Sequence, residues 1–116
     1  MKQLGMAMVS LLFFVNVYAT SQQIPADNKI TKINTYSATD VVFIFVTPGF
    51  NSTITGCTGD HTRVVLYPSA SYSANVYSAA LAAAASNNPK VGFGINGCYV
   101  NGSSSYPVLY RIDVEY

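Results

Sequence analysis

Apolar residues fall in short runs separated by turn-rich segments, a pattern typical of a mainly β protein. The run 41–46 (VVFIFV) is apolar on both faces and too short for a helix, so it predicts a buried strand. Further strands are predicted at 29–36, 63–67, 90–96 and 108–116. Ile30 and Ile33 do not alternate strictly, which favours a bulge or an irregular start in the first strand. Residues 20–28 are polar and predict an N-terminal arm.

One segment, 69–88, predicts a helix because it is rich in alanine and has no Gly or Pro inside. Its apolar stripe would consist of Val76, Tyr77, Ala80, Leu81 and Ala84. Ser69, Ser71 or Ser73 could cap its N-terminus, and Asn87-Asn88-Pro89 would end it. The segment has no charged residue, so its outer side is expected to lie at a subunit contact; a solitary helix whose serines suffice for solubility is the alternative. That side would consist of Ser71, Ser78, Ala82, Ala85 and Ser86.

The remaining segments fit the β pattern. Gly92 and Gly94 alternate with Val91, Phe93 and Ile95, which predicts tight curvature or close approach by another backbone. Residues 49–62 and 101–105 are predicted loops. Residues alternate between two faces in the last predicted strand. One face would carry Val108, Tyr110, Ile112, Val114 and Tyr116, and the other would carry Leu109, Arg111, Asp113 and Glu115.

The predicted order β-β-β-α-β-β is that of the OB-fold, a small five-stranded barrel. We therefore expect a single mainly β, OB-like domain over 20–116, with one helix and one disulfide. The competing architecture is an open antiparallel sheet with the helix packed on one face.

The N-terminus has the three parts of a secretory signal over 1–19. Lys2 gives the positive region, 4–15 is the apolar run, and Val17 and Ala19 satisfy the peptidase site before Thr20. A retained anchor is the alternative, but a spanning helix needs about 20 apolar residues. The sequence thus predicts export, to the periplasm or the cell exterior, with no transmembrane segment in the mature chain.

Two cysteines, Cys57 and Cys98, fit that compartment, where an even count favours a disulfide. A metal site, a reactive thiol and an intermolecular bridge are the alternatives. The sole histidine, His61, leaves few further metal ligands.

Charge and motifs exclude several functions. Lys and Arg number 6 and Asp and Glu 5, so the chain lacks the basic excess of nucleic-acid binders and the charge of disordered chains. No catalytic or nucleotide-binding motif is present. A small hydrolase using Asp60 and His61 is one hypothesis, against a plain loop pair satisfied by local hydrogen bonds. Asp113 and Glu115 share a strand face about 7 Å apart, a separation near that of the two carboxylates of a glycosidase. Adjacent outward carboxylates on a strand normally only solvate that face. We assign no catalytic, cofactor or metal residue and expect no enzyme.

Tyrosine is abundant, with nine residues and no Trp. Its flat face and hydroxyl tip suit sugar stacking and interfaces. Tyr72, Tyr99 and Tyr106 are the predicted ligand or interface contacts, and packing in the barrel core or rim is the alternative.

The second half of the chain also resembles a known group. The features are Cys57, a strand ending at Pro68, a helix of small residues, the strand 91–95 with Gly97-Cys98, and Tyr106-Pro107 before the last strand. This layout resembles small secreted proteins of Gram-negative bacteria and is similar to B subunits of AB5 toxins of the pertussis and subtilase-cytotoxin type. Those subunits carry a Trp near the mature N-terminus that this chain lacks, and none of their sugar-binding residues is assigned here.

That resemblance implies an OB-fold subunit that binds glycans and assembles into a ring. We therefore expect a secreted, non-catalytic carbohydrate- or receptor-binding module like a toxin B subunit, with a glycan or host-surface receptor and other copies of the chain as partners, and no nucleic acid. The alternative is an envelope-associated structural or self-assembling surface protein that associates through sheet edges such as that of strand 41–46.

Overall fold

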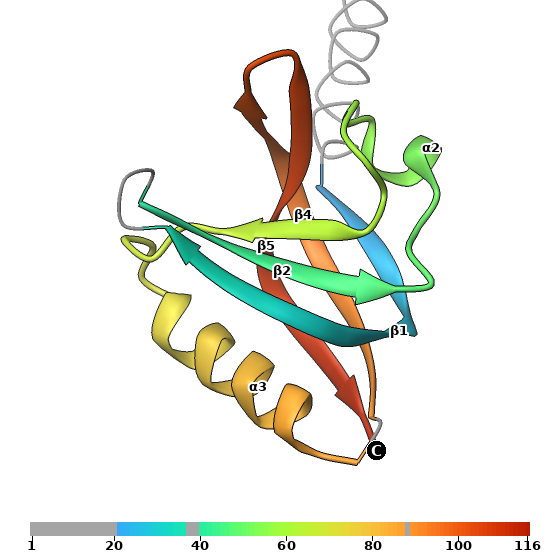
Figure 1. Ribbon diagram of the computed structural model, residues 1–116, viewed down its shortest axis with the longest axis vertical. Coiled ribbons are helices and arrows are strands. Elements are labelled where there is room, and N and C mark those ends of the chain that lie inside the picture. Colours follow the sequence, from blue (N-terminus) through green and yellow to red (C-terminus); the bar gives the residue numbers. More distant parts are fainter. Residues whose placement is uncertain (1–20, 37–39, 88) are drawn as a thin grey trace, which may run out of the picture.

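The computed structural model describes residues 21–36, 40–87 and 89–116, and the predicted signal segment 1–19 lies outside them. Within these described residues, five strands and two helices follow one another (Figure 1). They are β1 (Ser21–Tyr36), β2 (Val41–Thr47), α2 (Ser52–Thr55), β3 (Arg63–Leu66), α3 (Ser73–Ala85), β4 (Lys90–Asn101) and β5 (Ser104–Glu115).

The five strands form one sheet that closes into a ring, in the spatial order β1-β2-β3-β5-β4. Strand β1 closes it, because it pairs antiparallel with both β2 and β4. The one parallel pair joins β3 to β5 through Val65 and Val108. Helix α3 lies across one end of the ring, and the β4–β5 hairpin projects beyond the other (Figure 1). The protein is thus mainly β, as predicted.

The main core fills the ring. Every strand contributes at least one fully buried side chain, among them Ile24, Ile44, Val64, Phe93 and Leu109. Helix α3 closes the core from one end with Val76, Ala80 and Ala83, whose i, i+4, i+7 spacing places them on one face.

The predicted arm 20–28 was wrong from Ser21 on, since that stretch is the first half of β1. Its polar residues did not signal a strand, but its backbone pairs with β4 from Ser21–Asn96 to Asn28–Val91. Asn28 is buried, and its Oδ1 accepts a hydrogen bond from the Gly49 N–H at 2.6 Å. The predicted irregularity is confirmed, because the β1–β2 register shifts between Ile30 and Lys32.

The glycines of β4 lie where other groups approach closely, as predicted. A Cβ on Gly92 would lie 2.5 Å from the Ile24 carbonyl oxygen, and one on Gly94 would meet the ring of Tyr110 at 2.9 Å. Close passage of the β1 backbone therefore requires glycine at position 92.

Strands β4 and β5 are longer than predicted. Gly97-Cys98 does not end β4, and the predicted loop 101–105 shrinks to a tight turn because β5 already begins at Ser104. The strict alternation predicted for the last strand was also wrong. Gly94 pairs with Arg111 but Ile95 pairs with Leu109, so the register shift at Tyr110 turns Leu109 into the core.

Helix α3 is shorter than the predicted 69–88, and Tyr72 precedes it without a side-chain cap. None of the three serines caps it, and the Ser73 hydroxyl donates instead to the Pro68 carbonyl at 2.6 Å. The predicted stripe was partly wrong: Leu81 is 45% exposed and Ala84 is exposed, whereas Ala83 is buried. The helix ends at an extended Ser86 rather than at the asparagines, and Asn88 lies outside the described residues. The short α2 forms inside the predicted loop 49–62.

The predicted disulfide between Cys57 and Cys98 is confirmed, with the two Cα atoms 5.8 Å apart. It ties the segment before β3 to the outer part of β4, and it leaves neither sulfur free as a metal ligand or nucleophile. None of the helices in the described part of the chain has the length and apolar character to span a membrane.

Candidate functional site

Strand β2 is apolar on both faces because it separates two hydrophobic clusters. Val42, Ile44 and Val46 point into the ring. The alternate residues Val41 and Phe43 are buried on the outer face, with Phe45 half-buried beside them. The outer cluster exists because side chains from other strands cover this face, and the residues that cover it make up the candidate site.

Strand pairing places a basic, an aromatic and a second basic residue side by side on this outer face. Phe45 of β2 pairs with Lys32 of β1 on one side and with Arg63 of β3 on the other. Directly opposed residues on neighbouring strands project to the same face. The three side chains therefore form a row across β1, β2 and β3.

Both cations of the row lie over aromatic rings. Lys32 Nζ is 4.4 Å from the centroid of Phe45, and the Arg63 guanidinium carbon is 4.6 Å from the same centroid. The guanidinium also lies 4.8 Å from the Tyr106 ring and 5.6 Å from the Phe43 ring. Ring faces attract cations, so these contacts hold the two charged groups on the apolar surface.

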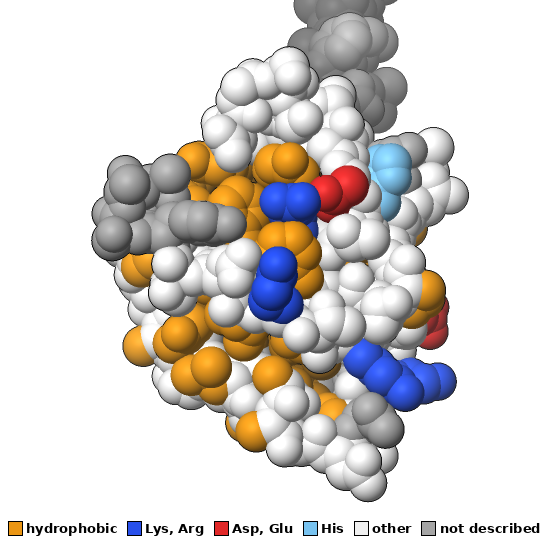
Figure 2. Space-filling view, in the orientation of Figure 1, with side chains coloured by type: hydrophobic (Ala, Val, Ile, Leu, Met, Phe, Trp, Pro, Cys, Tyr) orange, Lys and Arg blue, Asp and Glu red, His pale blue; other side chains and the backbone are white. Residues whose placement is uncertain are grey.

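We call this surface the aromatic–cation patch. It comprises Lys32, Phe43, Phe45, Arg63, Tyr67, Tyr99 and Tyr106. Figure 2 shows basic side chains lying among hydrophobic ones in the middle of this face.

Asp60 fixes one of the two cations. Its carboxylate accepts hydrogen bonds from Nε of Arg63, at 3.2 Å to Oδ1, and from Nη2, to Oδ2. Partial burial alone would raise the pKa of Asp60, but hydrogen bonds from Arg63 and Thr62 and the charge of Arg63 outweigh it and lower that pKa. Lys32 has no such partner, since no carboxylate of the described residues forms an ion pair with it. Its ammonium group is exposed and available to a ligand.

The structure brings together two of the three predicted contact tyrosines. Tyr99 and Tyr106 are register partners on the β4–β5 hairpin, and both rings pack edge-on against Phe43, at 6.1 and 5.6 Å between centroids. Tyr106 is buried, so within the patch it serves as packing, whereas Tyr99 is half-buried and reaches the surface. Tyr72, at the start of α3, packs against the main core instead.

Tyr67 extends the patch beside Tyr99, with 6.0 Å between ring centroids. Burial raises the pKa of the Tyr67 hydroxyl, and the neighbouring Tyr99 and Tyr72 hydroxyls raise it further because a second phenolate nearby would be repelled. Tyr67 therefore stays a neutral hydrogen-bonding group at physiological pH.

Sequence reasoning missed the central row of the patch. Lys32, Phe45 and Arg63 lie in three different predicted strands, and no spacing along the chain connects them. A signal was present in the outward-facing aromatics of 41–46, since an apolar outer face on a strand requires cover. It identified the strand but not its neighbours across the sheet.

Three of the groups considered for catalysis, Asp60, His61 and Asp113, have partners of their own. Asp60 pairs with Arg63, while the His61 ring packs edge-on against Phe50 at 6.2 Å. Asp113 forms an ion pair with Arg111, at 3.1 Å from Nε. In residues 21–36, 40–87 and 89–116, no three His, Cys, Asp or Glu side chains come together as a metal site would require.

No protein-family model, curated protein or solved structure matches this chain. Any function proposed for the chain therefore rests on its own geometry.

Proposed function

We propose that this protein is a secreted, non-catalytic binding module that recognises a glycan, or a glycan-bearing receptor, through the aromatic–cation patch. The observation that carries the proposal is the row Lys32–Phe45–Arg63 on the outer face of the sheet. Half-exposed rings next to fixed hydrogen-bond donors are the groups that sugars need. The apolar C–H face of a pyranose stacks on a ring, and its hydroxyls accept from cationic donors.

The ring order supports an OB-like architecture. What supports it is the ring of five strands together with the place of α3 between β3 and β4 along the chain. In OB-folds the face formed around strands 2 and 3 binds oligosaccharides and oligonucleotides. The central row of the aromatic–cation patch lies across β1, β2 and β3, so in an OB-fold the patch would lie on that face. Two cations, one of them neutralised by Asp60, favour a sugar over the basic groove that a nucleic-acid strand requires.

Export of the protein fits its architecture. Cleavage after Ala19 would leave Thr20 as the first residue, one position before β1 begins at Ser21. The mature chain would then keep both pairings of β1, and its disulfide suits an oxidising compartment. Mass analysis of the secreted protein tests this, and an intact Met1 would contradict it.

A glycan array probed with mature protein tests the main proposal. The variants are Lys32→Ala and Phe45→Ala, with Lys90→Ala as the control, because Lys90 is an exposed cation outside the patch. Both patch variants should lose most binding, while the control should retain it. The proposal fails if no glycan or host-cell surface binds at high micromolar concentration, or if all three variants bind like the parent.

The alternative function is that of a self-assembling surface protein. The pairing of β2 does not support it, but the uncharged helix α3 does. Strand β2 is paired on both sides, by β1 and β3, so it has no free edge for another chain. Helix α3 favours association instead. It has no charged residue, and its outward residues Ser78, Ala82 and Ala85 are exposed, together with Leu81. Light scattering separates the two functions: open-ended polymers favour the alternative, and a closed small oligomer favours the binding module.

A further inference from the structure

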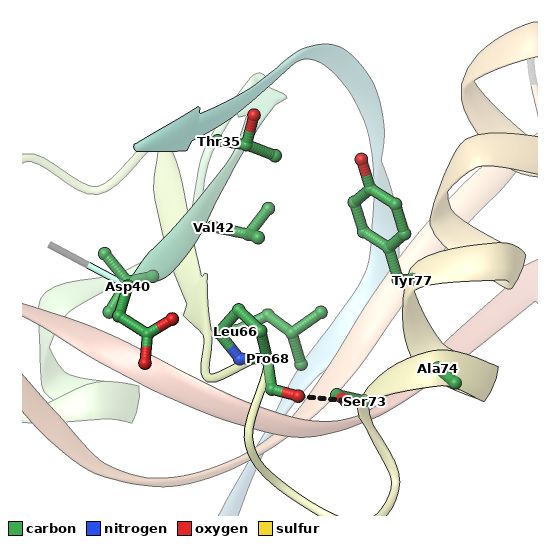
Figure 3. Close-up of a pocket in the computed structure, with 9 residues that line it drawn as sticks. Thr35, Asp40, Val42, Leu66, Pro68, Ser73, Ala74 and Tyr77 are labelled. Atoms are coloured by element: carbon green, nitrogen blue, oxygen red, sulfur yellow. Dashed lines mark hydrogen bonds between the residues drawn. The ribbon is translucent and has the colours of Figure 1, made fainter. Parts of the chain in front are cut away.

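A second site lies at the end of the ring that α3 covers. A pocket of about 470 Å³ opens where the starts of β2 and α3 meet the end of β3 (Figure 3). Val42 and Leu66, both buried residues of the main core, form its apolar wall, and Pro68 and Ala74 extend it. The volume falls within the range of small-molecule sites, about 300 to 1,000 Å³.

Two groups on opposite sides of the pocket set its chemistry. Asp40 lies on one side and the ring of Tyr77 on the other, with Val42, Leu66 and Pro68 between them (Figure 3). Asp40 is the sole charged residue among those found to line the pocket.

The Asp40 carboxylate has free acceptor capacity. It forms no hydrogen bond or ion pair with any described residue. The Ser73 hydroxyl, in contrast, is already bonded to the Pro68 carbonyl. The backbone of Asp40 is left-handed, with φ 55°, which an L residue rarely adopts outside a defined turn.

We propose that this pocket binds a small organic cation, namely a protonated amine on a compact apolar body. The ammonium group would lie beside the Asp40 carboxylate, which accepts its hydrogen bonds, and the apolar body would reach across the pocket toward the Tyr77 ring. The apolar body would pack on the buried residues Val42 and Leu66, so the apolar surface of the ligand would leave water. An anion would meet the Asp40 charge, and a neutral molecule would gain no ion pair. This site is separate from the aromatic–cation patch and does not depend on glycan binding.

The test is a titration of the mature protein followed by the methyl NMR signals of Val42 and Leu66. The probes are 2-phenylethylammonium, the neutral 2-phenylethanol and the anionic 3-phenylpropionate, which share a phenyl ring. The ammonium ion should bind most tightly and the anion least. Asp40→Asn should weaken ammonium binding roughly threefold to fivefold, the size of an exposed ion pair, and leave the alcohol unchanged. Asparagine tolerates the left-handed backbone, so this variant keeps the turn.

Asp27→Asn is the matched control, because it removes the same charge from an exposed position in β1 that does not line the pocket. It should leave all three affinities unchanged. Higher salt should weaken the ammonium ion selectively, since exposed charge pairs are screened. The proposal is overturned if no probe gives saturable shifts at Val42 and Leu66. It is also overturned if the ammonium ion and the alcohol bind equally to the parent and to Asp40→Asn.

Discussion

Replacing Gly92 with alanine should open the ring between β1 and β4. The added Cβ would lie 2.5 Å from the carbonyl oxygen of Ile24, 2.7 Å from the nitrogen of Ala26 and 2.8 Å from the carbonyl carbon of Pro25. All three are backbone atoms of β1, which cannot rotate away. Strand β4 cannot retreat either, because Gly92 is held on its other side by pairing with Asp113 of β5.

The cost follows from these contacts. Overpacking a core by one methyl typically costs about 1 to 3 kcal/mol, and here relief requires β1 to move. That movement would expose Ile24, which is fully buried and contributes about 1.5 to 3 kcal/mol. The lower chain entropy of alanine returns at most about 1 kcal/mol. We therefore expect Gly92→Ala to lower the free energy of unfolding by about 3 kcal/mol or more, a large share of the roughly 5 to 15 kcal/mol of a small domain.

Gly94→Ala is the matched control on the same strand. Its Cβ would meet atoms of the Tyr110 side chain at 2.9 to 3.1 Å, and that ring can turn aside. We expect a cost near 1 kcal/mol, at the low end of overpacking. Urea unfolding followed by far-ultraviolet circular dichroism gives both values. A Gly92→Ala protein within about 1 kcal/mol of the parent, or a Gly94→Ala protein that is less stable than Gly92→Ala, would refute the reasoning. If Gly92→Ala does not fold at all, a native spectrum for Gly94→Ala still supports it.

Three further changes test other features of the fold. Cys98→Ser removes a bridge to Cys57 that spans a sequence separation of 41, and by loop entropy it should cost about 4 kcal/mol; an unchanged urea midpoint would contradict this. Asp60→Asn should cost less than about 1 kcal/mol at pH 7, because the carboxylate is 44% exposed. Since the folded pKa of Asp60 lies below its ordinary value of 3.8, this stabilisation is present above that value and is lost as the pH falls through the lowered pKa; a pH-independent difference in stability would argue against the ion pair with Arg63. Ala82→Glu should convert the mature protein to a monomer without unfolding it, and a parent already monomeric at tens of micromolar by analytical ultracentrifugation would exclude a contact through α3.

The sequence predicted the elements whose signals are local. Six consecutive apolar residues in 41–46 are enough to place a doubly buried strand. A charge-free alanine segment is enough to place α3, although its ends and its buried stripe needed the contacts of the folded chain. An even pair of cysteines was enough for the bridge between Cys57 and Cys98.

Elements that depend on distant partners escaped prediction. The first half of β1 carries Gln22, Gln23 and Asp27, and it forms a strand because β4 supplies hydrogen bonds from about 70 residues away along the chain. The inward turn of Leu109 depends on a register shift against β4, which alternation along one strand cannot reveal.

The candidate site was only half accessible from the sequence, for the same reason. Tyr99 and Tyr106 stood out by composition. Lys32 and Arg63 were two ordinary cations until the register placed them on either side of Phe45.

The way in which β1 closes the ring also bears on how the chain reaches its folded state. A chain that crosses a membrane from its N-terminus delivers β1, β2 and β3 first, but the partner for the start of β1 follows only with β4. Until then, a three-stranded sheet carries an unpaired edge at Gln22 and an uncovered core face, both of which attract other chains. Long-range strand pairing is also slow compared with helix formation. On the proposal that the chain is exported, the interval before β4 emerges is therefore the period in which this edge is open to other chains.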